Sequence, residues 1–251
     1  MIRTLALLFF CASGLSGAAS AQSGETPCRD VRYQSASYTV CTVDMAQDRL
    51  DLFLYDDTGK PYGHFASLDR MLLAKGKKLS FAMNAGMYHE NRAPVGHYIE
   101  NGKELKRVIP NAGPGNFGLL PNGVLCIRQG RAHVIETLRY LDNRPACTHA
   151  TQSGPMLVID GKLHPRFLPD SDSRYIRNGV GTSRDGKTAA FVISNAPVTF
   201  HAFASFFRDY LKLSQALYFD GNISRLYAPN LNRSDFGFTM LGPIIGVVTD
   251  K

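Results

Sequence analysis

The sequence predicts an α+β fold, a single domain with a mixed, largely antiparallel sheet and packed helices. The first observation is a set of four Asn-Gly or Asp-Gly pairs that each lie between short apolar runs. Such pairs are a strong local signal for β-hairpins. The pairs are Asn101-Gly102, Asn122-Gly123, Asp160-Gly161 and Asp185-Gly186. The second observation is that no repeat, low-complexity tract or linker divides the chain, which favours one domain.

Short apolar runs near these turns have the length and composition of buried strands. We expect strands over residues 79–83, 124–128, 156–159, 189–193, 216–219 and 244–248. The hairpin signals between several of these runs indicate that most neighbouring strands are antiparallel.

Two segments have helical spacing. Ser67 is a suitable N-cap for a helix with apolar residues on one face and Gly76 as its C-terminal stop. The second helix has apolar residues at positions i, i+3, i+4, i+7 and i+8. These are Phe203, Phe206, Phe207, Tyr210 and Leu211. A row of this kind is typical of a helix that packs on a sheet.

Residues 1–21 have the pattern of a secretory signal peptide, with Arg3, an apolar run and the small-residue site Ala19-Ser20-Ala21. Residues 22–251 would then form the mature domain, which we expect to be periplasmic or secreted. The apolar run is far shorter than the roughly 20 residues of a spanning helix, so no stable membrane insertion is expected. Cys11 suggests lipidation as an alternative, but bulky phenylalanines precede it where small residues are expected.

Four cysteines remain in the mature chain, an even number that favours disulfides in an exported protein. They are Cys28, Cys41, Cys126 and Cys147. Of three possible pairings we favour the one in sequence order, because it closes the shortest loops. Zinc is the competing interpretation, but no two of these cysteines have the close spacing that zinc sites usually show.

The charge and motif content narrow the classes of function. The formal net charge of +7 suits an anionic ligand or an envelope surface. No Lys/Arg cluster with interleaved aromatic residues is present, so nucleic-acid binding is not expected. The motifs H-E-x-x-H and G-x-S-x-G are also absent, and Asp170-Ser171-Asp172 lacks the later residues of a calcium loop. We therefore predict no metal and no cofactor.

Three segments could carry chemistry. Asn84 follows an apolar strand and precedes Gly86, Asp220 follows another strand beside Gly221, and Arg177 lies in a glycine-containing stretch. Loops at strand ends often carry active sites, and arginine with nearby backbone N–H groups can bind a phosphate. Taken singly, each segment is equally compatible with an ordinary turn or a surface hairpin.

These segments, taken in order with two more, resemble the motifs of the phosphodiester glycosidase family. The resemblance covers about residues 79–226 and comprises five motifs. In this sequence the matching positions are Asn84, Gly86 and Tyr88; Pro94 and Gly96; Gly154-Pro155 up to Asp160-Gly161; Arg177, Gly179 and Gly181; and Asp220, Gly221 and Ser224. Two positions depart from the pattern, since Asn178 replaces a small hydroxyl residue and Asn222 replaces the second glycine of a D-G-G motif.

The resemblance implies an exported hydrolase that cleaves the glycosidic bond of a sugar 1-phosphodiester in the cell envelope. Asp220 would support the oxocarbenium-like carbon or activate water, Arg177 would hold the phosphate, and Asn84 would orient the sugar. Further residues are expected to contact the substrate. These are Gly86, Tyr88, Gly154, Gly179, Gly181, Gly221, Ser224, Glu90 and His97.

Two other functions are compatible with the same residues. One is an envelope module that binds a glycan or glycan phosphate without cleaving it, which the replacement at Asn222 and the single carboxylate favour. The other is a phosphodiesterase that cuts the P–O bond. Hydrolysis in oxygen-18 water distinguishes the three, because the label enters the sugar, the phosphate or neither.

Overall fold

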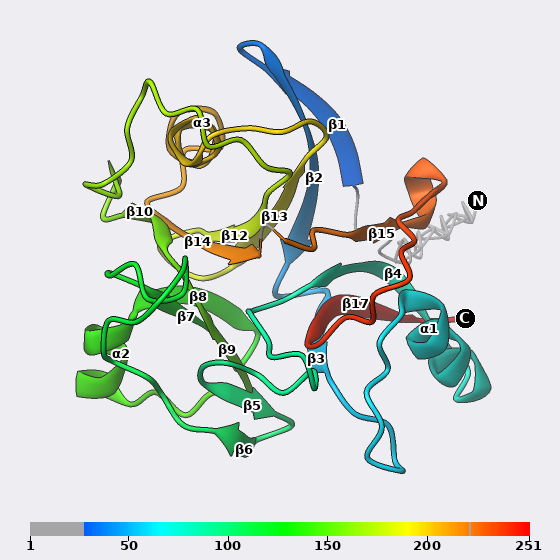
Figure 1. The fold of residues 1–251 in the computed structure, drawn as a ribbon. Coiled ribbons are helices and arrows are strands. Elements are labelled where there is room, and N and C mark those ends of the chain that lie inside the picture. Colours follow the sequence, from blue (N-terminus) through cyan, green and yellow to red (C-terminus); the bar gives the residue numbers. More distant parts are fainter. Residues whose placement is uncertain (1–27, 221) are drawn as a thin grey trace, which may run out of the picture.

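The strands form three antiparallel sheets around a shared apolar core (Figure 1). The computed structural model describes residues 28–220 and 222–251, so the predicted signal peptide lies outside the described residues. Every strand pairing within the described ranges is antiparallel. The predicted antiparallel pairing and packed helices are confirmed, but the strands form three sheets in place of one mixed sheet, and the fold is richer in sheet than a balanced α+β protein.

The largest sheet has seven strands. In spatial order they are β1 (Cys28–Tyr33), β2 (Ala36–Asp44), β13 (Thr188–Ser194), β12 (Asn178–Thr182), β14 (Gln215–Asp220), β10 (Met156–Ile159) and β11 (Lys162–Leu163). Strands distant in sequence are neighbours here, because β13 joins β2 and β14 lies between β12 and β10. Residues 178–220 therefore contribute the centre of this sheet.

The other two sheets have five strands each. The second sheet contains β16 (Arg233–Ser234), β15 (Leu226–Ala228), β4 (Lys77–Asn84), β17 (Ile244–Asp250) and β3 (Arg49–Phe53). The third contains β6 (Lys103–Lys106), β5 (Tyr98–Glu100), β9 (His149–Ser153), β7 (Gly123–Arg128) and β8 (Arg131–Glu136). The six strands predicted from apolar runs are all confirmed.

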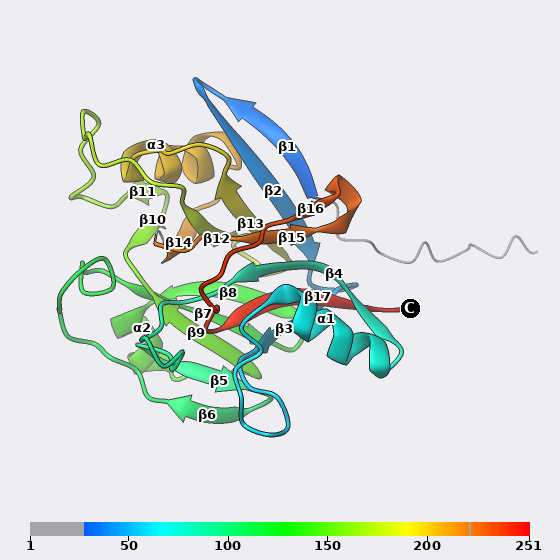
Figure 2. The same cartoon turned by 45° about the vertical axis from the view of Figure 1, so that its right-hand side comes forward.

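Each sheet buries one face in the common core and covers the other with a helix (Figures 1 and 2). Side chains from all three sheets meet at the centre, among them Val180, Phe81 and Leu125. The outer faces pack against α3 (Phe200–Ser205), α1 (Phe65–Ala74) and α2 (Thr137–Asn143), in the order of the sheets above. No helix within the described residues is long and apolar enough to span a membrane.

Three of the four predicted hairpins are confirmed. Asn101-Gly102 joins β5 to β6, Asp160-Gly161 joins β10 to β11, and Asp185-Gly186 lies between β12 and β13. Both residues of the first two turns have positive φ, as the two-residue hairpin requires. The hairpin predicted at Asn122-Gly123 is wrong. The Asn122 side chain is instead buried before β7, where it accepts a hydrogen bond from the Thr137 hydroxyl at 2.6 Å.

Both predicted helices are present, with altered bounds. Helix α1 begins at Phe65 and not after Ser67, because Phe65 already packs into the core beneath β4; its end before Gly76, with φ +72°, is confirmed. The second helix runs from α3 into a π-helical segment, Phe206–Tyr210. Its predicted apolar face packs on the seven-stranded sheet, with Phe203, Phe206 and Phe207 fully buried.

The predicted disulfide pairing is confirmed. Cys28–Cys41 joins directly opposed residues of β1 and β2, and Cys126–Cys147 joins β7 to the segment before β9. Both pairs are buried, so each disulfide adds a covalent link inside the packed structure.

Loss of the Cys126–Cys147 disulfide, which closes the longer of the two loops, should lower the stability of the fold. Replacing Cys126 and Cys147 together by serine should lower the free energy of unfolding by about 2–4 kcal/mol, because the unfolded chain regains the entropy of an open loop. Urea denaturation of the oxidised wild type and the double variant measures the difference. An unchanged unfolding midpoint would contradict the assignment of a stabilising role to this disulfide.

Candidate active site

Ends of strands from all three sheets converge at one place. Strand β4 ends at Asn84, β14 ends at Asp220 and β12 begins at Asn178. Strand β9 of the third sheet ends at Ser153, whose hydroxyl donates to the Phe219 carbonyl at 2.8 Å. A site at this junction would be held by the rigid sheets and not by long loops.

Two buried asparagines join the second sheet to the seven-stranded sheet. The Asn178 Nδ2 donates to the backbone carbonyl of Asn84 at 2.9 Å and to its Oδ1 at 3.1 Å. Asn84 itself donates from Nδ2 to the Ile223 carbonyl at 2.7 Å and accepts from the Arg225 backbone N–H at 2.8 Å. Both asparagines are 0 % exposed, so these hydrogen bonds satisfy groups that have no access to solvent.

The same Asn178 side chain holds the loop that follows β14. Its Oδ1 accepts from the Asp220 backbone N–H at 3.1 Å and from the Ser224 hydroxyl at 3.3 Å. The Ser224 hydroxyl also contacts the Asp220 carbonyl at 2.8 Å, and the backbone N–H of Asn222 donates to the Asp220 carboxylate at 2.9 Å. The hydrogen-bonded pair Asn84 and Asn178, called here the asparagine network, therefore fixes the segment that carries the candidate carboxylate. Gly221 lies outside the described residues.

Two tyrosines lie in the electrostatic field of Asp220. Burial, with a smaller contribution from the Asp220 carboxylate, raises the pKa of Tyr88 to about 12. The same two causes, in the same order, raise the pKa of Tyr218, whereas the Arg177 guanidinium, 3.5 Å from its hydroxyl, opposes the shift. Both hydroxyls therefore stay protonated at neutral pH. The Gly242 backbone N–H approaches the buried Tyr88 hydroxyl and opposes the rise in its pKa, whereas no described group accepts the hydroxyl proton.

Arg177 is enclosed and is only 1 % exposed. Its guanidinium lies over the Phe200 ring, 3.6 Å from the centroid, and donates to the carbonyls of Val198 at 2.9 Å and Ser173 at 3.1 Å. Burial lowers its pKa, but arginine remains charged at neutral pH. Arg177 is thus a fixed positive charge behind Tyr218, and its surroundings do not present the guanidinium to a phosphate at the surface.

The predicted glycines lie where strands approach one another closely. A Cβ atom at Gly86 would come within 2.5 Å of the Thr151 hydroxyl oxygen, and one at Gly179 within 2.5 Å of the Leu217 carbonyl oxygen. Gly154 and Gly181 are similarly crowded by neighbouring side chains. Close packing therefore accounts for the absence of side chains at these four positions.

Two other predicted residues, His97 and Glu90, are not part of the asparagine network. His97 is buried beside the third sheet, where its Nδ1 lies 2.8 Å from the Lys106 carbonyl oxygen and its Nε2 lies 2.9 Å from the Tyr140 hydroxyl. These two contacts occupy both ring nitrogens. Glu90 is exposed in the turn that follows Tyr88.

Comparison with known proteins agrees with the motifs. The sequence profile described as phosphodiester glycosidase matches residues 77–247, which is more than half of the chain. The chain belongs to the phosphodiester glycosidase family. The matched range includes every strand end that builds the candidate site, from β4 through β12 and β14.

Relatives of this phosphodiester glycosidase family member are found in sequence and in structure. The uncharacterized protein YigE of Escherichia coli (strain K12) is 33 % identical over 186 residues, 74 % of this chain and 72 % of that protein. The catalytic domain of zebrafish N-acetylglucosamine-1-phosphodiester alpha-N-acetylglucosaminidase, auto-inhibited by its pro-peptide, has a similar fold. Its TM-score is 0.59 at 14 % identity, with 94 % of this chain and 86 % of that chain covered.

A second solved structure, a hypothetical protein from Synechocystis, also shares the fold. The TM-score is 0.61 at 14 % identity, and the match covers 88 % of this chain and 61 % of that chain. At this level of identity the two solved structures establish the architecture alone.

Sequence reasoning missed two functional candidates. In the sequence Asn178 is only a departure from the family pattern, yet its side chain contacts three residues in two other segments. Arg225 directly follows Ser224 of the last family motif, and this position is the sequence signal that could have identified it. Within the described ranges, no group of three or more His, Cys, Asp or Glu side chains is arranged to hold a metal ion.

Loss of the Asn178 side chain should destabilise the junction. Asn178→Ala removes hydrogen bonds to Asn84, Asp220 and Ser224 and leaves buried polar groups unpaired, so the free energy of unfolding should fall by about 2–4 kcal/mol. Asn143→Ala, which removes one exposed hydrogen bond, should cost less than about 1 kcal/mol. Equal losses in chemical denaturation would refute the special role of Asn178.

His97 should make stability fall at mildly acidic pH. Burial lowers the pKa of His97 below its ordinary value of 6.5, so the unfolded chain binds a proton where the folded protein does not. Stability should therefore decrease as the pH falls through about 6.5 towards the folded-state pKa. Denaturation of His97→Gln between pH 7 and pH 5 should show a weaker pH dependence than wild type, whereas exposed His89→Gln should match wild type.

Proposed function

We propose that this protein hydrolyses the glycosidic bond of a sugar 1-phosphodiester, of the N-acetylglucosamine 1-phosphodiester type, in the cell envelope. The observation that carries the proposal is the placement of Asp220, at the junction of three sheets and on a segment that Asn178 and Ser224 hold in place. Family membership and the activity named for the zebrafish structural neighbour support the same reaction class.

A single carboxylate suits this substrate. An ordinary glycoside needs a carboxylic acid to protonate its basic leaving group, which is why two carboxylates flank the bond in most glycosidases. A phosphomonoester leaves as a stable anion without that proton. Asp220 would then stabilise the oxocarbenium-like carbon or activate water, while cationic groups stabilise the leaving phosphate.

The contacts refine the roles expected for the other residues. The Asn84 side chain is hydrogen-bonded to Ile223, Arg225 and Asn178. We therefore assign Asn84 to holding the loop and not to orienting the sugar. Tyr88, with a protonated hydroxyl near Asp220, is the better candidate for a hydrogen bond to the substrate. Arg177 would contribute as a buried positive charge behind Tyr218.

Asn222 does not disrupt the carboxylate segment, although it replaces a family glycine. Its backbone N–H donates to the Asp220 carboxylate in a local turn, an interaction that asparagine and glycine can make equally. The replacement at Asn222 is therefore not in itself an argument for a purely binding role. The two disulfides support an oxidising compartment such as the periplasm, in keeping with the proposed export.

The decisive experiment is hydrolysis of an N-acetylglucosamine 1-phosphodiester by the purified protein in oxygen-18 water. Label in the sugar supports the glycosidase, whereas label in the phosphate indicates P–O cleavage. Binding without turnover would indicate the non-catalytic envelope module.

Asp220→Asn should lower kcat/KM by about 10²–10⁴-fold, because the amide preserves the hydrogen bond from Asn222 but removes the charge. Steady-state kinetics on the same substrate measure the loss. Exposed Asp142→Asn on α2 is the matched control and should retain wild-type kinetics. Full activity in a folded Asp220→Asn protein would contradict the proposed role of Asp220 as the catalytic carboxylate.

A further inference from the structure

A groove begins beside the candidate carboxylate segment. One cavity of about 420 Å³ is lined by residues of the segment after Asp220, of the segment around Phe236, of β13 and of the stretch before β12. They are Asn222, Ile223, Ser224, Arg225, Arg233, Asp235, Phe236, Ile176 and Ile193. An adjoining cavity of about 240 Å³, towards the start of α1, shares Arg225, Asp235 and Phe236 with it. The groove is therefore continuous with the residues that follow Asp220.

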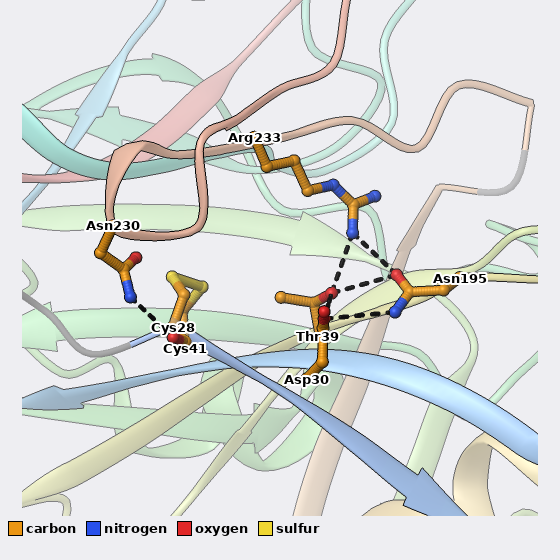
Figure 3. Close-up of a disulfide and its surroundings, with 7 residues drawn as sticks. All are labelled: Cys28, Asp30, Thr39, Cys41, Asn195, Asn230 and Arg233. Atoms are coloured by element: carbon orange, nitrogen blue, oxygen red, sulfur yellow. Dashed lines mark hydrogen bonds between the residues drawn. A yellow bond between two sulfur atoms is a disulfide. The ribbon is translucent and has the colours of Figure 1, made fainter.

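Two arginines line the larger cavity, and one of them is already neutralised. Arg233 pairs with Asp235 at 2.9 Å and donates from Nη1 to the Thr39 hydroxyl and to Asn195 Oδ1. Figure 3 shows this side chain directed at Thr39 and Asn195, with the Cys28–Cys41 disulfide close by. These hydrogen bonds attach the Arg233 side of the groove to β2 and to the residue that follows β13 in the seven-stranded sheet.

Arg225 is the second arginine, and it is only partly satisfied. Its Nη1 donates to the carbonyls of Thr239 at 2.8 Å and Gly237 at 3.3 Å. A side chain at Gly237 would collide with the guanidinium, so glycine makes room for it. Among the described residues no carboxylate pairs with Arg225, and its Nε and Nη2 make no hydrogen bond. This edge of the guanidinium is the fork that binds phosphate through two parallel hydrogen bonds.

We propose that Arg225, in place of Arg177, binds the phosphate of the substrate. The proposal rests on the proposed function and names the residue that binds the anionic part of its substrate. Arg225 is placed for the task because its backbone N–H is anchored on Asn84 and its side chain lines the groove.

Calorimetric binding of N-acetylglucosamine 1-phosphate and of neutral N-acetylglucosamine tests the role of Arg225. Arg225→Gln should weaken binding of the phosphate-bearing ligand by roughly 10- to 100-fold and binding of the neutral sugar by less than about 3-fold. Arg225→Lys, which keeps the charge, should lie between Arg225→Gln and wild type. Exposed Arg29→Gln on β1 is the control and should bind both ligands as wild type does.

An equal loss for both ligands would mean that Arg225 only supports the loop at Thr239, which overturns the proposal. Failure of the wild type to bind the sugar phosphate at millimolar concentration overturns it as well. The test does not depend on turnover. If Arg225-dependent binding is found without cleavage, the proposed hydrolysis fails and the phosphate site stands. If cleavage is found and Arg225→Gln retains affinity and kcat/KM, the phosphate site fails alone.

Discussion

The buried pairing of Asn178 with Asn84 is the interaction on which the candidate site depends. One carboxamide has both a donor and an acceptor end, so Asn178 can bind the end of β4 with one and the loop after β14 with the other. A hydroxyl residue, which the family usually has at this position, is shorter and cannot span the same distance with two separate groups. Asn178 therefore links two sheets through one side chain.

The three-sheet architecture explains why such a link is needed. Each sheet shares the core through one face and is covered by a helix on the other, so the sheets meet chiefly through apolar contacts. Apolar packing is not directional and does not by itself fix the relative height of two strand ends. Hydrogen bonds between buried groups do fix the position of the strand ends, because a buried polar group left without a partner costs free energy. The polar network at Asn178 and the one at Arg233 supply this precision on either side of the groove.

Charge in the site is distributed over two arginines with different tasks. Arg177 is sequestered against Phe200, where it contributes a constant field and little freedom to move. Arg225 keeps a free edge beside the carboxylate segment. This separation of a buried charge from a partly exposed one leaves a cation available in the groove without exposing the interior of the seven-stranded sheet to water. The chain thereby combines a rigid scaffold with an accessible cation.

Much of this protein followed from local sequence signals. The strands over residues 79–83 and 216–219, three of the four hairpins and the pairing of the cysteines depend on neighbouring residues or on short loops, which periodicity and turn chemistry describe. The motif order likewise located Asn84 and Asp220 at strand ends. The Asn122-Gly123 turn failed because its asparagine bonds a distant helix, information that a two-residue signal does not contain.

Only the tertiary structure decided which of these residues act together. Sequence alone predicted a signal peptide and revealed the motif pattern of the phosphodiester glycosidase family, with a carboxylate at position 220. It could not determine that one sheet would become three, that His97 would be buried beside Tyr140, or that Arg177 would be enclosed while Arg225 lines a groove. The physical reason is that burial and hydrogen-bond partners arise from contacts between residues far apart in the chain, such as Asn84 and Asn178.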